Sequence, residues 1–335
     1  MGRAKLARPL TAFLIFFLIG GPSFFGPVSG GALQARETTP RETSPSQNPS
    51  RQSVDLQAHP GEVLTIDSNE EKKLHTVEVH SPGGKQVGTF QSFYIRNPDT
   101  AGPSNSAIQR GIKRVLVPFS STADTGTYRL SFFTESGEVF EERSIEIVER
   151  EFRSETIALN YSLSELRSSD DPEKYNQAVM IQSIYGTFNS DRLPGGLNFR
   201  VPLPVKESGE YRITSHYGDR RIFSYSDGRS ARSIHSGIDY AAPVETPVVS
   251  AEKGRVVLAE DRIISGYSVV IEHMPGVYSI YFHLHSLEVK KGEMVEKGER
   301  IGTVGMTGLA TGPHLHWEVR VNGVAVDPAM LTQID

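Results

Sequence analysis

Histidines gather in the last third of this 335-residue chain, where seven of its ten lie between His216 and His316. Three groups have spacings that could do chemistry: His235 with Asp239 four residues later, His283 with His285, and His314 with His316. On a strand, residues two apart point to the same face. His314 and His316 therefore share a face, while Leu315 turns into the core.

Two imidazoles on one buried face are costly unless something binds them. Zinc accepts nitrogen and oxygen ligands, and a catalytic zinc site uses three protein ligands and keeps one position open. Two histidines and one aspartate make such a set. Each pair alone is more typical of a structural or solvated histidine, but the three groups together predict a metal site of the catalytic type.

Other hydrolytic mechanisms lack their residues. The chain has no cysteine, which excludes thiolate zinc sites and cysteine nucleophiles. It has no His-Glu-x-x-His helix to supply a glutamate base, and no Gly-x-Ser-x-Gly elbow to present a serine nucleophile.

The elements that must position these residues are mainly β. Residues 198–335 combine β-like runs at 267–272, 277–283 and 315–321 with glycine turns, and predict a C-terminal β domain. Short β runs also fill 53–150, where Asp124, Gly126 and Tyr128 resemble the tyrosine corner of an immunoglobulin-like β-sandwich. Between them, residues 151–197 form a connector. Asp171 and Pro172 begin a helix there, at about 171–188.

The N-terminus predicts export. Residues 1–35 carry three early basic residues, an apolar run and small residues near position 35, as a signal peptide does. No charge interrupts residues 9–35, so an uncleaved segment at 9–28 could instead anchor the chain in a membrane. The composition of residues 36–52 predicts a disordered linker. The formal net charge is −5, and −8 without the first 35 residues, which does not favour nucleic-acid binding.

Residues 212–330 resemble the lysostaphin-type, or LytM-domain, zinc metallopeptidases. The resemblance covers a little over a third of the chain. It rests on these stretches: Ile213 to Ser215, Gly218 to Arg220, His235 to Tyr240, Thr246 to Val248, Val270 to His273, Tyr281 to Leu284, Gly305 to Gly308, Gly312 to Glu318, Asn322 with Gly323, and Asp327 with Pro328.

The resemblance implies an antiparallel β-sheet for the C-terminal domain, and roles for five residues. His235, Asp239 and His316 fall on the family's zinc ligands, with one zinc ion per chain. His283 and His314 fall on its two catalytic histidines, which do not bind the metal. The implied substrate is a peptide of bacterial peptidoglycan, and the implied location is the periplasm or cell envelope. His285 replaces the small polar residue that often follows this Leu284, and we interpret it as a surface side chain.

Two alternatives stay open at this point. Some proteins with this domain are non-catalytic activators of other wall hydrolases, but they usually lack the metal ligands. The N-terminal half could also cover the groove of an active domain and keep it latent. The sequence leaves open which bond is cut, a D-alanine–diamino acid cross-link or a glycine bridge.

Overall fold

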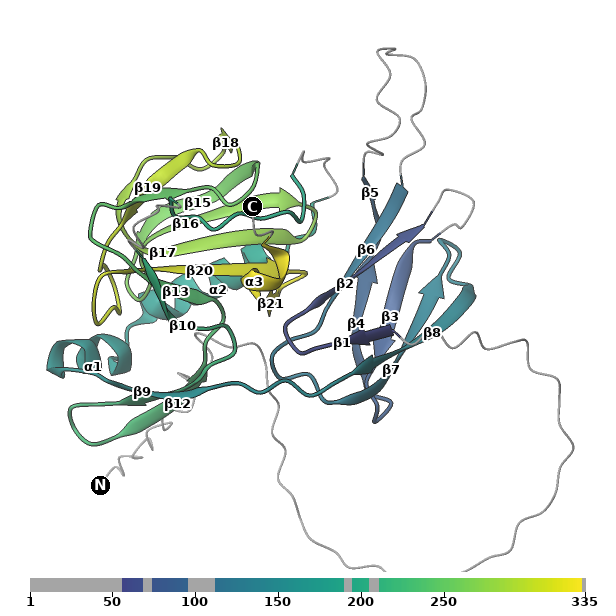
Figure 1. Cartoon of the computed structure of the whole chain (residues 1–335), viewed down its shortest axis with the longest axis horizontal. Helices are drawn as coiled ribbons and strands as arrows, with labels where there is room; N and C mark the ends of the chain where they lie inside the picture. The colour runs from purple at the N-terminus through teal and green to yellow at the C-terminus, as the bar shows by residue number, and fades with distance from the viewer. Residues whose placement is uncertain (1–55, 69–73, 96–111, 190–194, 205–210, 333–335) are drawn as a thin grey trace, which may run out of the picture.

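The structure is a computed structural model that describes residues 56–68, 74–95, 112–189, 195–204 and 211–332 (Figure 1). The predicted signal or anchor at 1–35 and the linker at 36–52 lie outside these residues. Among the helices of the described ranges, none is long and apolar enough to cross a membrane. Strands dominate the architecture, so the predicted mainly β class is confirmed.

The N-terminal part is a sandwich of two sheets. The larger runs in the order β1 (Leu56–Ala58), β8 (Val139–Ile147), β7 (Gly126–Phe133), β3 (Thr76–His80) and β4 (Gln86–Gln91), and the smaller in the order β2 (Val63–Ser68), β6 (Ile112–Pro118) and β5 (Phe93–Ile95). Alternating apolar residues of both sheets meet in one core, as Val77 and Val115 do. Tyr128 is buried and hydrogen-bonded to the backbone of Asp124, as a tyrosine corner requires.

The connector contains more structure than the one predicted helix. That helix, α2 (Pro172–Tyr185), begins where the Asp171 carboxylate accepts from the Glu173 amide and ends at Gly186. Before it lie β9 (Ser154–Ala158) and α1 (Tyr161–Ser168), which the sequence did not reveal. β9 pairs in parallel with β11 (Arg220–Ser224), and β11 pairs with β12 (Ser230–Ile234), so the connector joins a small sheet of the C-terminal part.

The C-terminal part is built on one large sheet. Its main path is β10 (Arg212–Ser215), β13 (Ile238–Ala241), β20 (His314–Val321), β17 (Val277–Leu287), β16 (Gly266–Met274), β15 (Gly254–Arg262) and β18 (Met294–Val295). The short strands β14 (Pro247–Val249), β19 (Arg300–Val304) and β21 (Val324–Val326) pair at its margins, and α3 (Pro328–Leu331) follows. All pairings in this sheet are antiparallel, as predicted.

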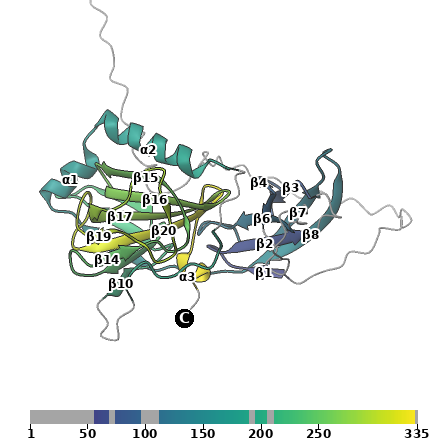
Figure 2. The ribbon, with the colours of Figure 1, turned by 90° about the horizontal axis from the view of Figure 1, so that it is seen from above.

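The central strand β20 divides the sheet into two chemically different faces. Leu315, Trp317, Val319 and Val321 are buried in the main core. The alternate residues His314, His316, Glu318 and Arg320 point to the opposite face. Helix α2 covers one end of that face, as Figure 2 shows, with Ile181 and Tyr185 packed on apolar residues of β15, β16 and β17. The polar end of the face stays open.

The two parts touch beside β21 and α3. The Tyr217 hydroxyl accepts a hydrogen bond from the Ser121 amide and donates one to the carbonyl of Ala325. Arg150 forms an ion pair with the buried Asp327. The sandwich thus packs against a different region from the polar face.

Candidate metal centre

Three side chains bring ligand atoms together on the polar face. Antiparallel pairing of β13 with β20 places Asp239 directly opposite His316. His235 lies in the turn before β13, where Gly237 lets the chain pass close to β20, because a Cβ there would lie 2.3 Å from the Trp317 carbonyl oxygen. The three nitrogen and oxygen atoms all lie within 4.8 Å of one another.

The distances between these atoms suit a tetrahedral ion. His235 Nε2 lies 3.1 Å from Asp239 Oδ1 and 3.0 Å from His316 Nδ1, and the remaining pair is 2.8 Å apart. Ligands bound to zinc at about 2.0–2.1 Å in tetrahedral geometry are separated by about 3.3 Å. A small relaxation outward would therefore accommodate the ion.

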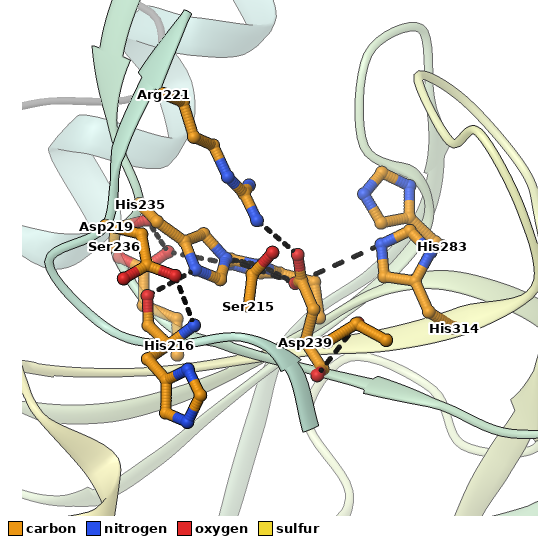
Figure 3. Close-up of polar contacts among 12 residues, drawn as sticks. Ser215, His216, Asp219, Arg221, His235, Ser236, Asp239, His283 and His314 are labelled. Atoms are coloured by element: carbon orange, nitrogen blue, oxygen red, sulfur yellow. Dashed lines mark hydrogen bonds and ion pairs between the residues drawn. The ribbon is translucent and has the colours of Figure 1, made fainter. Parts of the chain in front are cut away.

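Hydrogen bonds behind the site fix which ring nitrogen faces it. His235 Nδ1 donates to the His216 carbonyl at 2.8 Å, so its Nε2 lone pair points inward. His316 Nε2 lies 3.4 Å from Glu318 Oε2, which places its hydrogen there and leaves Nδ1 for a ligand. Arg221 donates to Asp239 Oδ2 at 2.5 Å, as Figure 3 shows, so Oδ1 is left for the centre. Such partners orient metal ligands in proteins, and this donor set fits zinc.

The electrostatics of the site keep Asp239 charged. Burial alone would raise its pKa, but His235, His316 and Arg221 outweigh burial and hold the pKa well below its usual range. Burial would likewise lower the pKa of His316, yet its bonds to Asp239 and Glu318 raise it to about 9. Burial lowers the pKa of His235. At neutral pH, an incoming metal ion must therefore displace a proton from His316.

His283 reaches the polar face through an irregularity in β17. Strict alternation would send it to the core side, because Phe282 pairs with His316 and already occupies the polar face. A register shift between β16 and β17 and a φ of +60° at His283 break the alternation. Bulges commonly redirect a side chain beside an active site, and strained non-glycine backbone gathers at functional positions.

His283 and His314 lie beside each other, next to the ligand set (Figure 3). Their ring centroids are 4.7 Å apart, and His314 Nε2 lies 4.0 Å from Asp239 Oδ1. Each Nδ1 donates to a carbonyl, that of Thr307 for His283 and that of Gly312 for His314, both at 2.8 Å. Each Nε2 is thereby left as a proton acceptor. Burial, with the nearby histidines, lowers the pKa of His283 to about 3, so its ring is neutral.

The remaining histidines of this part stand outside the group. His285 is half exposed, near Glu245, as its interpretation as a surface side chain implied. His273 is fully buried between the Lys253 carbonyl and the Ser279 hydroxyl, where it supports the fold. The ring of His216 lies near Arg153, and it is the His216 backbone that serves the site.

Three residues behind the ligands were not found from the sequence. Arg221 bonds Asp239 and also Glu155 of β9, at 2.5 Å each. Glu318 accepts from Ser236 and lies against His316. Strand alternation after His316 could have identified Glu318. Nothing local pointed to Arg221 or Glu155, because their contact depends on the pairing of β9 with β11.

The metal centre opens into a cavity of about 820 Å³. His283, His314 and His316 line one side, and residues of β9 and α2 line the other. None of its lining residues belongs to the described part of the sandwich. Among the described residues, the element that faces the groove is thus the connector.

Comparison with known proteins places this geometry in a family. Residues 233–328 match the model of peptidase family M23. The chain is 31% identical over 181 residues to the peptidoglycan DD-endopeptidase ShyA of Vibrio cholerae, covering 54% of this chain and 40% of ShyA. It is 45% identical over 95 residues to the DD-carboxypeptidase/endopeptidase Mpg of Neisseria meningitidis, covering 28% of this chain and 22% of Mpg.

The chain therefore spans less than half the length of these two curated relatives. A crystal structure of a Pseudomonas aeruginosa protein of the M23 type aligns with a TM-score of 0.55 at 22% identity, covering 81% of this chain and 93% of that one. This likeness shows a shared fold. The family match, rather than this likeness, identifies residues 233–328 as a domain of peptidase family M23, the lysostaphin or LytM type.

Proposed function

We propose that this protein is an exported zinc metallo-endopeptidase that hydrolyses peptide cross-links of bacterial peptidoglycan. The observation that carries the proposal is the convergence of His235, Asp239 and His316, with His283 and His314 beside them, inside an M23 domain. The name of ShyA, a peptidoglycan DD-endopeptidase, supports peptidoglycan as the substrate, and the name of Mpg supports peptidase activity.

His235, Asp239 and His316 would hold the ion. Bound there, zinc supplies Lewis acidity toward a carbonyl oxygen and lowers the pKa of a water toward about 7. His314 and His283 each present an Nε2 lone pair to the cavity, so either can accept the proton of the attacking water. The protonated ring can then donate to the developing oxyanion or to the leaving amine.

The enzyme reading is favoured over a non-catalytic regulator by the intact residue set. A regulator needs neither an ionised Asp239 nor two imidazoles with inward lone pairs. The strained backbone at His283 also points to catalysis, since a left-handed conformation costs about 1–3 kcal/mol and persists where function requires it. Envelope location follows from the substrate.

The test combines metal content with cleavage. The chain lacking its first 35 residues is assayed for zinc by elemental analysis and incubated with purified peptidoglycan sacculi, with and without a chelator. We expect about one zinc per chain and new peptide termini that disappear in the chelated sample.

Two variants separate binding from catalysis. His316→Ala should lose both zinc and cleavage, whereas His314→Ala should keep zinc and lose most of the cleavage rate. Bound zinc without cleavage by the unmodified chain would favour a latent enzyme, to be tested with residues 198–335 alone. Absence of both zinc and cleavage would refute the mechanism and leave the regulator. The cleaved bond is then read from the new termini.

A further inference from the structure

The cavity beside the metal centre carries more positive than negative side chains. Its charged lining consists of five cations and three carboxylates: Lys174, Arg212, Arg221, Arg262 and Arg320, with Glu155, Asp239 and Glu318. The carboxylates are already engaged, because Arg221 bonds Glu155 and Asp239 while Arg320 bonds Glu318. A zinc ion held by His235, Asp239 and His316 would add two further positive charges. The space that remains therefore favours an anionic ligand.

Arg262 is the buried cation with spare hydrogen-bonding capacity. Its residue is 8% exposed and lines the cavity at the end of β15. Nη1 donates to the Ser265 hydroxyl at 3.1 Å and Nη2 to the Gln177 carbonyl at 2.7 Å. Nε has no hydrogen-bond partner and forms only a long ion pair, at 3.8 Å, with the partly exposed Glu260. A guanidinium has five N–H donors, so three are unused among the described residues.

The charge of Arg262 is only weakly compensated. Its two hydrogen-bond acceptors are neutral, and its ion pair with Glu260 is long and partly exposed, whereas a buried charge is ordinarily closely paired. Lys174 on α2 is also buried in this wall, where it donates to the carbonyl and hydroxyl of Ser169 and is attracted by Asp170 and Asp171. The two cations line the same cavity from different elements, so both can contribute to attracting an anion there.

Arg262 is also linked to the reacting end of the cavity. The Ser265 hydroxyl accepts from Arg262, and the Ser265 carbonyl accepts from the amide of His283 at 2.9 Å. A ligand group bound to Arg262 would therefore be held at a fixed position relative to His283, because Ser265 contacts both residues. Guanidinium binds carboxylate through two parallel hydrogen bonds, which fixes both position and direction.

We propose that Arg262, supported by Lys174, forms a subsite for a carboxylate of the peptide substrate. The inference rests on the proposed peptidase function and deepens it, because it makes a free carboxylate near the scissile bond a specificity determinant. The connector helix α2 then belongs to the active site, since it supplies Lys174 and the carbonyl that orients Arg262.

The experiment measures binding separately from cleavage. The zinc-loaded chain without its first 35 residues is titrated by calorimetry with N-acetyl-D-alanyl-D-alanine and with the carboxamide of the same dipeptide. We expect the carboxylate form to bind at least tenfold more tightly. In Arg262→Gln that preference should fall below about threefold, and in Arg262→Lys it should be partly kept because the charge remains.

Control variants distinguish a role of Arg262 in carboxylate binding from a purely structural role. Arg300→Gln removes one positive charge from an exposed ion pair with Glu288, outside the cavity, and should keep the full preference. Thermal unfolding reports whether the Arg262 variants remain folded, and Arg262→Lys tests the idea if the Gln variant does not.

The outcomes are separable from those of the proposed function. If a folded Arg262→Gln variant still binds the carboxylate form more tightly, the preference comes from the metal and the proposed subsite is refuted. Absence of preference in the unmodified chain would overturn it too. Preference that depends on Arg262, in a chain that leaves sacculi intact, would uphold the subsite while refuting the peptidase.

Discussion

Replacing Glu318 by Gln should weaken both the fold and metal binding, by separable amounts. Glu318 is 2% exposed and accepts from Arg320 Nε at 2.5 Å and from the Ser236 hydroxyl at 2.8 Å. Burial alone would raise its pKa, but Arg320, His316 and Ser236 lower it from 4.5 to about 2. That difference corresponds to about 3 kcal/mol in favour of the charged carboxylate.

The expected loss of stability follows from that figure. Gln keeps the shape but leaves the buried Arg320 without a counter-charge, so the free energy of unfolding should fall by about 3 kcal/mol. It is measured by urea denaturation in the presence of a chelator, which removes any contribution from the metal. The double variant Glu318→Gln with Arg320→Met removes the orphaned charge as well and should recover part of the loss.

The expected loss of metal affinity has a different origin. Glu318 lies 3.4 Å from His316 Nε2 and fixes the ring so that Nδ1 faces Asp239. Loss of such a partner lowers metal affinity by about 10–100-fold. Competition with a chromophoric chelator measures it. The double variant should not recover zinc affinity, because the carboxylate is still missing. Wild-type affinity in a folded Glu318→Gln variant would refute this role for Glu318.

Three further perturbations test other parts of the reasoning. Burial lowers the pKa of His273 from its ordinary 6.5 to about 4. As the pH falls, the histidine is therefore protonated first in the unfolded chain, and the folded state loses stability between about pH 6.5 and 4. Between pH 8 and 5, the unmodified chain should therefore lose about 2 kcal/mol more than His273→Gln in urea denaturation, and parallel curves would contradict this. Tyr217→Phe removes the bond to Ser121 and should cost about 1–3 kcal/mol of unfolding free energy, with an unchanged denaturation midpoint as the contrary result. Gly266 has a φ of +62°, and a Cβ there would lie 2.1 Å from Thr307 Oγ1. Because the Thr307 carbonyl orients the His283 ring, Gly266→Ala should slow sacculus cleavage by about 100-fold at unchanged zinc content, and unimpaired cleavage would count against the role of that bond.

Much of the site's chemistry was determined by the sequence itself. Alternation on a strand puts His314 and His316 on one face whatever the rest of the fold does, and the structure has them there. The same rule placed Leu315 in the core. Capping by Asp171 and the position of Pro172 located helix α2, because helix starts depend on local hydrogen bonds and backbone angles. The identity of the five site residues came from family resemblance, and their roles stay a proposal.

Tertiary structure decided how those residues meet. Asp239 faces His316, 77 residues away, only because β13 pairs with β20 in one particular register. His283 reaches the same cavity because a bulge and a left-handed backbone override the alternation expected of its strand. Arg221 and Arg262 acquire their roles from the parallel pairing of β9 and the docking of α2. Local sequence specifies which face of a strand a side chain occupies, whereas long-range strand pairing determines which faces are brought together. The hydrophobic periodicity of a single strand does not indicate which strand it pairs with.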